Sequence, residues 1–176
     1  MATPGFDRVQ RCPRLAALAA ALLLLAMAPG AGAIQVGDEA PKLEGPALEG
    51  PGTLSLADLR GKVVYLDFWA SWCGPCAAAL PAIDALQKEF GDQGFQVLAV
   101  NVDQDVKDAK RFLSRRPVGY PSVVNPSGSI PTSFDVQTMP TSFLIDRDGV
   151  VRYVHKGFRS GDEKELRSHI QALVAK

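Results

Sequence analysis

The feature that most constrains the fold is a pair of cysteines between a predicted strand and a predicted helix. Residues 63–69 are a nearly continuous apolar run that contains a single aspartate, Asp67. Such a run is typical of a strand buried on both faces of a sheet. The motif Cys73-Gly74-Pro75-Cys76 follows, and apolar residues then recur at helical spacing over residues 77–90. We therefore expect the cysteines at a strand-to-helix junction of an α/β fold.

Further strands and helices alternate along the rest of the chain. The expected segments are strands at residues 95–102, 122–124, 141–145 and 150–155, and helices at residues 106–116, 131–134 and 162–175. Arg147-Asp148-Gly149 reads as the tight turn of a hairpin between the last two strands. Alternating strands and helices indicate a parallel part of a sheet, and the hairpin makes that sheet mixed. The expected architecture is a mixed central β-sheet flanked by helices.

The first 60 residues fall into two parts, residues 1–33 and residues 34–60, which differ in composition. Three arginines precede residues 15–28, a run of 14 residues that are all Ala, Leu or Met, and small residues up to Ala33 follow. This layout is typical of a cleaved secretory signal peptide. The alternative interpretation is an uncleaved membrane anchor. A membrane-spanning helix needs about 20 apolar residues, and this run is shorter. We expect a signal peptide at residues 1–33 and one domain at residues 34–176, exported to the periplasm. Residues 34–60 are rich in Gly and Pro and read as an irregular lead-in with a short hairpin.

Charge and cysteine content exclude several classes of function. The chain has 19 Lys+Arg and 19 Asp+Glu, with no long charged block, so nothing indicates a nucleic acid or an acidic lipid surface as a partner. Without residues 1–33, Cys73 and Cys76 are the only cysteines. An exported domain of 143 residues can bury a core without disulfide staples. The close pair therefore indicates redox chemistry.

The place of each cysteine predicts its role. A thiolate attacks a disulfide, and the partial positive charge of a helix N-terminus favours a thiolate. We expect Cys73 to be an exposed nucleophile with a lowered pKa, and Cys76, one turn deeper, to resolve the mixed disulfide. Gly74 and Pro75 fit the first helical positions. Burial of an unpaired carboxylate costs free energy, which disfavours a purely structural role for Asp67. We therefore expect Asp67 to be the proton acceptor for Cys76.

Zinc is an alternative ligand for the two thiols. A closed zinc site needs four ligands, and the chain offers only His155 and His169 besides the cysteines. We expect no metal and no cofactor, and we interpret both histidines as structural or solvated.

The motifs resemble those of a known family. Residues 67–76, with the letters DFWASWCGPC, are similar to the active-site segment of the thioredoxin superfamily. Pro81 matches the proline inside the family's active-site helix, and Met139-Pro140-Thr141 matches its cis-proline loop. Gly157 matches a glycine that lines the substrate groove. The resemblance covers about residues 36–176.

Within the superfamily, the chain looks like the TlpA/ResA type of exported thiol–disulfide oxidoreductase. Residues 61–64 and 139–149 are similar to phrases of that group, and the stretch from Asp103 to Pro140 resembles its strand–helix insertion. The resemblance implies a thioredoxin fold with an N-terminal extension, this central insertion and a cis Met139–Pro140 bond. It also implies a substrate-binding surface made by Trp72, Gly74, Pro75, Met139, Pro140 and Gly157.

The same resemblance implies a function. The expected reaction is reduction of protein disulfides in the periplasm by a monomer, with electrons from a membrane thiol donor. Apocytochrome c and copper-site assembly proteins are the expected clients. A disulfide oxidase and a copper-binding assembly chaperone on the same fold are the alternatives. One departure matters, because Ala99 stands where thioredoxins have a lysine beside the buried aspartate. We therefore expect desolvation to raise the pKa of Asp67.

Overall fold

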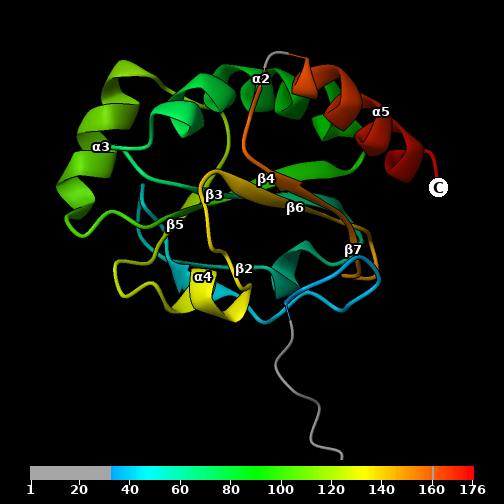
Figure 1. Cartoon of the computed structure of the whole chain (residues 1–176), viewed down its shortest axis with the longest axis horizontal. Helices are drawn as coiled ribbons and strands as arrows, with labels where there is room; N and C mark the ends of the chain where they lie inside the picture. The colour runs from blue at the N-terminus through cyan, green and yellow to red at the C-terminus, as the bar shows by residue number, and fades with distance from the viewer. Residues whose placement is uncertain (1–32, 160) are drawn as a thin grey trace, which may run out of the picture. The chain divides into compact units, whose positions relative to one another are not determined.

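A five-stranded mixed sheet lies at the centre of the structure, a computed structural model that describes residues 33–159 and 161–176 (Figure 1). In the order in which they neighbour one another, the strands are β5 (Ser122–Val124), β4 (Phe95–Asn101), β3 (Val63–Trp69), β6 (Thr141–Ile145) and β7 (Val151–Lys156). β3, β4 and β5 are parallel, whereas β6 is antiparallel to β3 and β7 to β6. This is the mixed sheet that the sequence predicts.

Helices cover both faces of this sheet (Figure 1). One face carries α2 (Gly74–Phe90), α3 (Val106–Arg115) and α5 (Asp162–Val174). The other face carries α4 (Ser129–Ser133) and the hairpin of β1 (Glu44–Pro46) and β2 (Thr53–Ser55). Two 3-10 turns complete the fold, η1 (Ala57–Leu59) and η2 (Gly91–Gln93). The predicted hairpin in the N-terminal extension and the predicted insertion, α3 with β5, are both confirmed.

Strand β3 separates two apolar cores, and every one of its residues is buried. Tyr65 and Trp69 belong to the core under α2 and α5, whereas Leu66 and Phe68 belong to the core under α4. Because successive side chains of a strand point to opposite faces, Asp67 shares the face of Tyr65 and Trp69. The carboxyl group therefore lies on the side of the sheet that α2 covers.

Three predicted strands have the observed bounds, and most other element ends differ by one or two residues. The helix expected from residue 77 begins instead at Gly74, because the side chain of Cys73 caps its first turn. The last strand begins at Val151 rather than Val150. Val150 closes the preceding turn instead, since its N–H donates to Asp146 Oδ1 at 2.9 Å and its carbonyl accepts from the Asp146 N–H at 2.9 Å.

The predicted signal peptide lies outside the described residues apart from Ala33. Among the residues that the structure does describe, no helix has the length and apolarity needed to cross a membrane.

Candidate active site

Cys73 and Cys76 form a disulfide at the N-terminus of α2, with their Cα atoms 5.3 Å apart. Cys73 is the N-cap residue, and its Sγ accepts a hydrogen bond from the backbone N–H of Cys76 at 3.2 Å. Once the disulfide is reduced, a sulfur in this position faces unpaired N–H groups and the positive end of the helix dipole, which favour the thiolate. Pro75 costs no hydrogen bond in this first turn. The local geometry suits Cys73 as the attacking sulfur.

The expected exposure of Cys73 is wrong for the disulfide form. Its exposed fraction is 5%, against 1% for Cys76. The reason is local, because the sulfur of Cys73 turns back to Cys76 and to the backbone of the same turn. The predicted order, with Cys76 the deeper of the two, is confirmed. Trp72, Gly74 and Pro75 are exposed, and 68% of the surface of Trp72 is accessible.

A groove of about 650 Å³ borders Cys73. Trp72, Gly74 and Pro75 line it from the active-site segment, and Met139 lines it from the loop before β6. The remaining lining residues are Val102, Gln104, Pro126, Ser127, Gly128, Pro131, Val136, Gln137 and Thr138. Most of these come from the insertion, and sequence reasoning missed their contribution. No local pattern in residues 126–138 could have placed them beside Cys73, since they lie more than 50 positions further along the chain.

The Met139–Pro140 peptide bond is cis, as the resemblance implies. Gly157 supports this loop, because its N–H donates to the Pro140 carbonyl at 2.7 Å. Gly157 has a φ of +84°, a left-handed conformation that favours glycine. It is not among the residues that line the groove beside Cys73, and its contact is with the loop that carries Met139.

Asp67 is a buried carboxyl group, with an exposed fraction of 1%. No partner in the described part of the chain hydrogen bonds to its Oδ2. Its neighbour on β4 is Ala99, whose methyl group brings no charge, and the Oγ of its neighbour on β6, Ser142, bonds to the Tyr65 hydroxyl at 2.6 Å. Desolvation by burial raises the pKa of Asp67 to about 8, which confirms the predicted direction. The group can therefore take up and release a proton near neutral pH.

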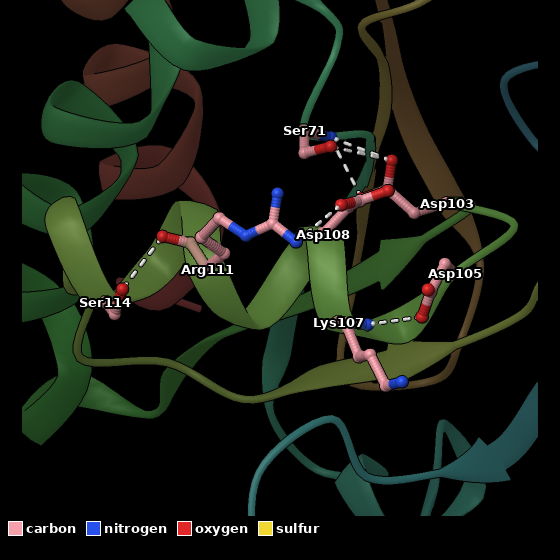
Figure 2. Close-up of polar contacts among 7 residues, drawn as sticks. All are labelled: Ser71, Asp103, Asp105, Lys107, Asp108, Arg111 and Ser114. Carbon is pink, nitrogen blue, oxygen red and sulfur yellow. Dashed lines mark hydrogen bonds and ion pairs between the residues drawn. The ribbon is translucent and has the colours of Figure 1, made fainter.

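A second buried carboxyl group, Asp103, escaped the sequence reasoning. It accepts hydrogen bonds from the Ser71 N–H at 3.0 Å, from the Ser71 hydroxyl at 2.9 Å and from the Asn101 side-chain amide at 2.8 Å. Figure 2 shows the contacts with Ser71, which hold the segment just before the cysteines. A signal was present, since Asp103 follows β4 just as Ser71 follows β3. The carboxyl ends of neighbouring parallel strands meet at one edge of a sheet.

Three further residues, Tyr120, His155 and His169, have polar or ring groups whose contacts bear on the predictions. The Tyr120 hydroxyl has no hydrogen-bond partner among the described residues, and burial, followed by the charge of Asp67, raises the pKa of Tyr120. His155 bonds to Asp162 Oδ2 at 3.1 Å, and the ring of His169 stacks on Tyr153 with centroids 3.6 Å apart. Both histidines thus have contacts of their own, in keeping with the structural interpretation.

Comparisons with known proteins agree with this site. The family model described as Redoxin matches residues 35–170. The chain belongs to the redoxin family. Thiol-disulfide oxidoreductase ResA of Bacillus cereus is 32% identical over 141 residues, which are 80% of each chain. Thioredoxin-like protein YneN of Bacillus subtilis is 35% identical over 135 residues, 75% of this chain and 78% of that protein.

Solved structures place this redoxin family member in the same fold. A Chlorobium tepidum protein assigned as thiol:disulfide interchange protein DsbE is 43% identical, with a TM-score of 0.78, and the match covers 81% of this chain and 99% of that one. The exposed lipoprotein thioredoxin Etrx1 of Streptococcus pneumoniae is 33% identical, with a TM-score of 0.66, over 76% of this chain and 100% of that one. The thioredoxin fold of the TlpA/ResA type is confirmed, and the chain is a thiol–disulfide oxidoreductase.

Proposed function

We propose that this redoxin is a periplasmic reductase of protein disulfides. The observation that carries the proposal is the placement of Cys73 at the N-terminus of α2, next to the groove, with the unpaired Asp67 on the face of β3 beneath that helix. These parts supply a nucleophile, a place for a polypeptide and a proton acceptor.

The first step is attack on the client. The reduced Cys73 thiolate attacks one sulfur of the client disulfide. A bond forms between Cys73 and that sulfur, the client S–S bond breaks, and the released client thiolate takes a proton from solvent. Trp72 and Met139 line the groove on which the client polypeptide lies.

The second step releases the product. Cys76 gives its proton to the ionised Asp67 and attacks the Sγ of Cys73. The bond between Cys73 and the client breaks, the second client thiolate is protonated, and the Cys73–Cys76 disulfide forms. Two electrons have then passed to the client. A membrane thiol donor returns the pair to the dithiol, and apocytochrome c and copper-site assembly proteins are the proposed clients.

Trapping tests these roles and the identity of the client. Cys76→Ser should accumulate a mixed disulfide on Cys73 in periplasmic extracts, and mass spectrometry identifies the bound protein. Cys73→Ser is the matched control and should accumulate none. A mixed disulfide that forms only through Cys76 contradicts the assignment of the nucleophile.

The reduction potential tests the direction of electron flow. Thioredoxin lies near about −270 mV and the oxidant DsbA near about −120 mV. We expect this pair to equilibrate with glutathione buffers nearer the thioredoxin value. A potential above about −150 mV supports a disulfide oxidase instead.

A further inference from the structure

A second hollow, of about 360 Å³, borders the active-site segment and shares no lining residue with the groove. We call it the arginine pocket, and its lining residues are Ser71, Asp108, Arg111, Phe112, Arg115 and Arg116. Ser71 lies two positions before Cys73, so the chain allows their Cα atoms to be at most about 7 Å apart. A polypeptide held at Cys73 therefore passes close to this pocket.

The pocket carries an excess of positive charge. It has three guanidinium groups against one carboxylate, and that carboxylate, Asp108, pairs with Arg111 at 3.4 Å. Figure 2 shows this pair on α3. Arg115 and Arg116 are exposed, and neither has an ion-pair partner among residues 33–159 and 161–176. Lys107 and Lys110 of the same helix are exposed as well. The positive charge is local, because residues 34–176 as a whole carry 16 Lys+Arg and 18 Asp+Glu.

Helix capping does not account for these arginines. Cations near a helix C-terminus can bond to its last carbonyls. The hydrogen bonds of the described residues include none from the guanidinium groups of Arg115 and Arg116. Arg116 instead lies over the Phe112 ring at 5.1 Å from its centroid. Arg111 stands a turn before the helix end, so its place in the pocket has no capping function either.

Ser71, one of the residues that line the pocket, is held in place by hydrogen bonds. The N–H and hydroxyl groups of Ser71 both donate to the buried Asp103, which also accepts from Asn101. These bonds join the active-site segment to the end of β4, from which α3 follows. A group bound by the arginines is thereby held at a set distance from the nucleophile.

We propose that the arginine pocket binds an acidic segment of the client protein, close in the client sequence to the cysteine that Cys73 attacks. A guanidinium group binds a carboxylate through two parallel N–H donors. A cluster of arginines therefore favours carboxylate side chains over neutral ones. This inference rests on the proposed function, since it concerns the polypeptide that forms the mixed disulfide. It adds a charge requirement to a site whose groove by itself is lined largely by uncharged residues.

Peptides that differ only in charge test the proposal. Both are disulfide-linked, and glutamates beside the cysteine in one are replaced by glutamines in the other. The reduced Cys76→Ser protein should form a mixed disulfide with the acidic peptide about tenfold faster at low salt, the lower end of the range for electrostatic steering. The preference should shrink as salt is added.

Charge removal locates the effect. In the Cys76→Ser background, Arg115→Gln with Arg116→Gln should bring the rate for the acidic peptide down to that for the neutral one. Lys42→Gln with Lys62→Gln is the matched control, because it removes two exposed charges outside the pocket and should keep the preference. Quenched-flow alkylation and intact mass give the rates.

Each other outcome decides against the proposal in a recognisable way. Equal rates for the two peptides, or a preference that survives loss of the arginines, overturn the acidic-segment inference and leave the proposed function intact. A preference lost to the same extent in the lysine control shows an effect of overall charge, and also overturns it. Absence of exchange with either peptide overturns the proposed function and the inference together.

Discussion

Two buried carboxyl groups, one on strand β3 and one just after the neighbouring strand β4, have opposite environments. Asp67 on β3 is 1% exposed, and its Oδ2 has no hydrogen-bond partner in the described part of the chain. Asp103, just after β4, is 2% exposed and accepts from Ser71 and Asn101. Burial alone is therefore not what separates them. The difference is in the number of donors that each carboxylate meets.

This contrast is the basis on which we propose different roles for the two acids. A carboxylate with several donors is held in one place and fixes the segment that donates to it. A carboxylate without them lowers stability when it ionises, and its proton affinity rises accordingly. We interpret Asp103 as the group that positions the active-site segment, and Asp67 as the group that exchanges a proton with Cys76.

The largest expected effect is on the pH dependence of stability. The pKa of Asp67 is raised to about 8 in the folded state, from about 3.9 when unfolded. The stability that the neutral Asp67 side chain allows is fully present below the unfolded-state pKa of about 3.9. It is lost as pH rises towards 8, because the unfolded chain ionises this group and the folded chain resists its ionisation. Asp67→Asn removes this loss, so the variant should become more stable than the parent by about 5 kcal/mol near pH 8, and should match it near pH 4.

Urea unfolding of both disulfide-bonded proteins at several pH values checks this difference. Because other titrating groups are shared, their effects cancel between parent and variant. A difference in unfolding free energy that stays constant with pH, or a variant less stable than the parent at pH 8, contradicts the raised pKa of Asp67.

The second effect has the opposite sign. Asp103→Ala leaves the Ser71 and Asn101 donors without their acceptor and should destabilise the fold by about 3 kcal/mol. Asp105→Ala is a useful control, because Asp105 is an exposed cap whose side chain accepts from the Lys107 N–H, and the loss of this cap should cost about 1 kcal/mol. Urea unfolding at neutral pH measures both. Equal losses in the two variants refute the structural importance of Asp103.

The third effect is kinetic. Asp67→Asn should slow resolution of the mixed disulfide about 100-fold at pH 7, because the proton acceptor for Cys76 is lost; this equals about 2.7 kcal/mol. The rate at which Cys73 forms the mixed disulfide is the internal control and should change far less. Stopped-flow reduction of insulin with acid-quench analysis separates the two rates. An unchanged rate of resolution means that another group accepts the proton.

The smallest effect is at Ser71. Ser71→Ala removes the hydroxyl donor to Asp103 and keeps the backbone donor, so the loss of stability should be about 1 kcal/mol. The stability of Ser71→Ala should therefore lie between that of the parent and that of Asp103→Ala. A loss as large as that of Asp103→Ala would assign the whole network to this one hydroxyl group. Thermal unfolding of the two variants side by side gives the comparison.

Local pattern predicted much of the fold. Residues 63–69 and 141–145 were expected as strands with the bounds that the structure has, because an apolar β-branched run ends where glycine, proline or a polar turn interrupts it. The Cys73–Cys76 pair was expected at a helix N-terminus for a similar reason, since Pro75 is suited to the first turn alone. These features depend on residues that are close together in the chain.

Contacts between distant segments could not be predicted in this way. Asp103 and Ser71 lie 32 positions apart and meet because β3 and β4 are parallel neighbours. The burial of Cys73 was mispredicted, since exposure at a helix N-terminus depends on whether its sulfur turns outward or back to Cys76.

By itself, the sequence determined the redox pair, the order of strands and helices, and the presence of a lone acid inside a buried strand. Each of these follows from residue type and spacing along a single element. The tertiary structure alone decided which buried acid has donors, which residues of the insertion line the groove, and that arginines of α3 lie beside Ser71. The physical reason is that hydrogen bonding and charge depend on the distance between groups in space. Sheet register and helix packing set that distance once the chain has folded.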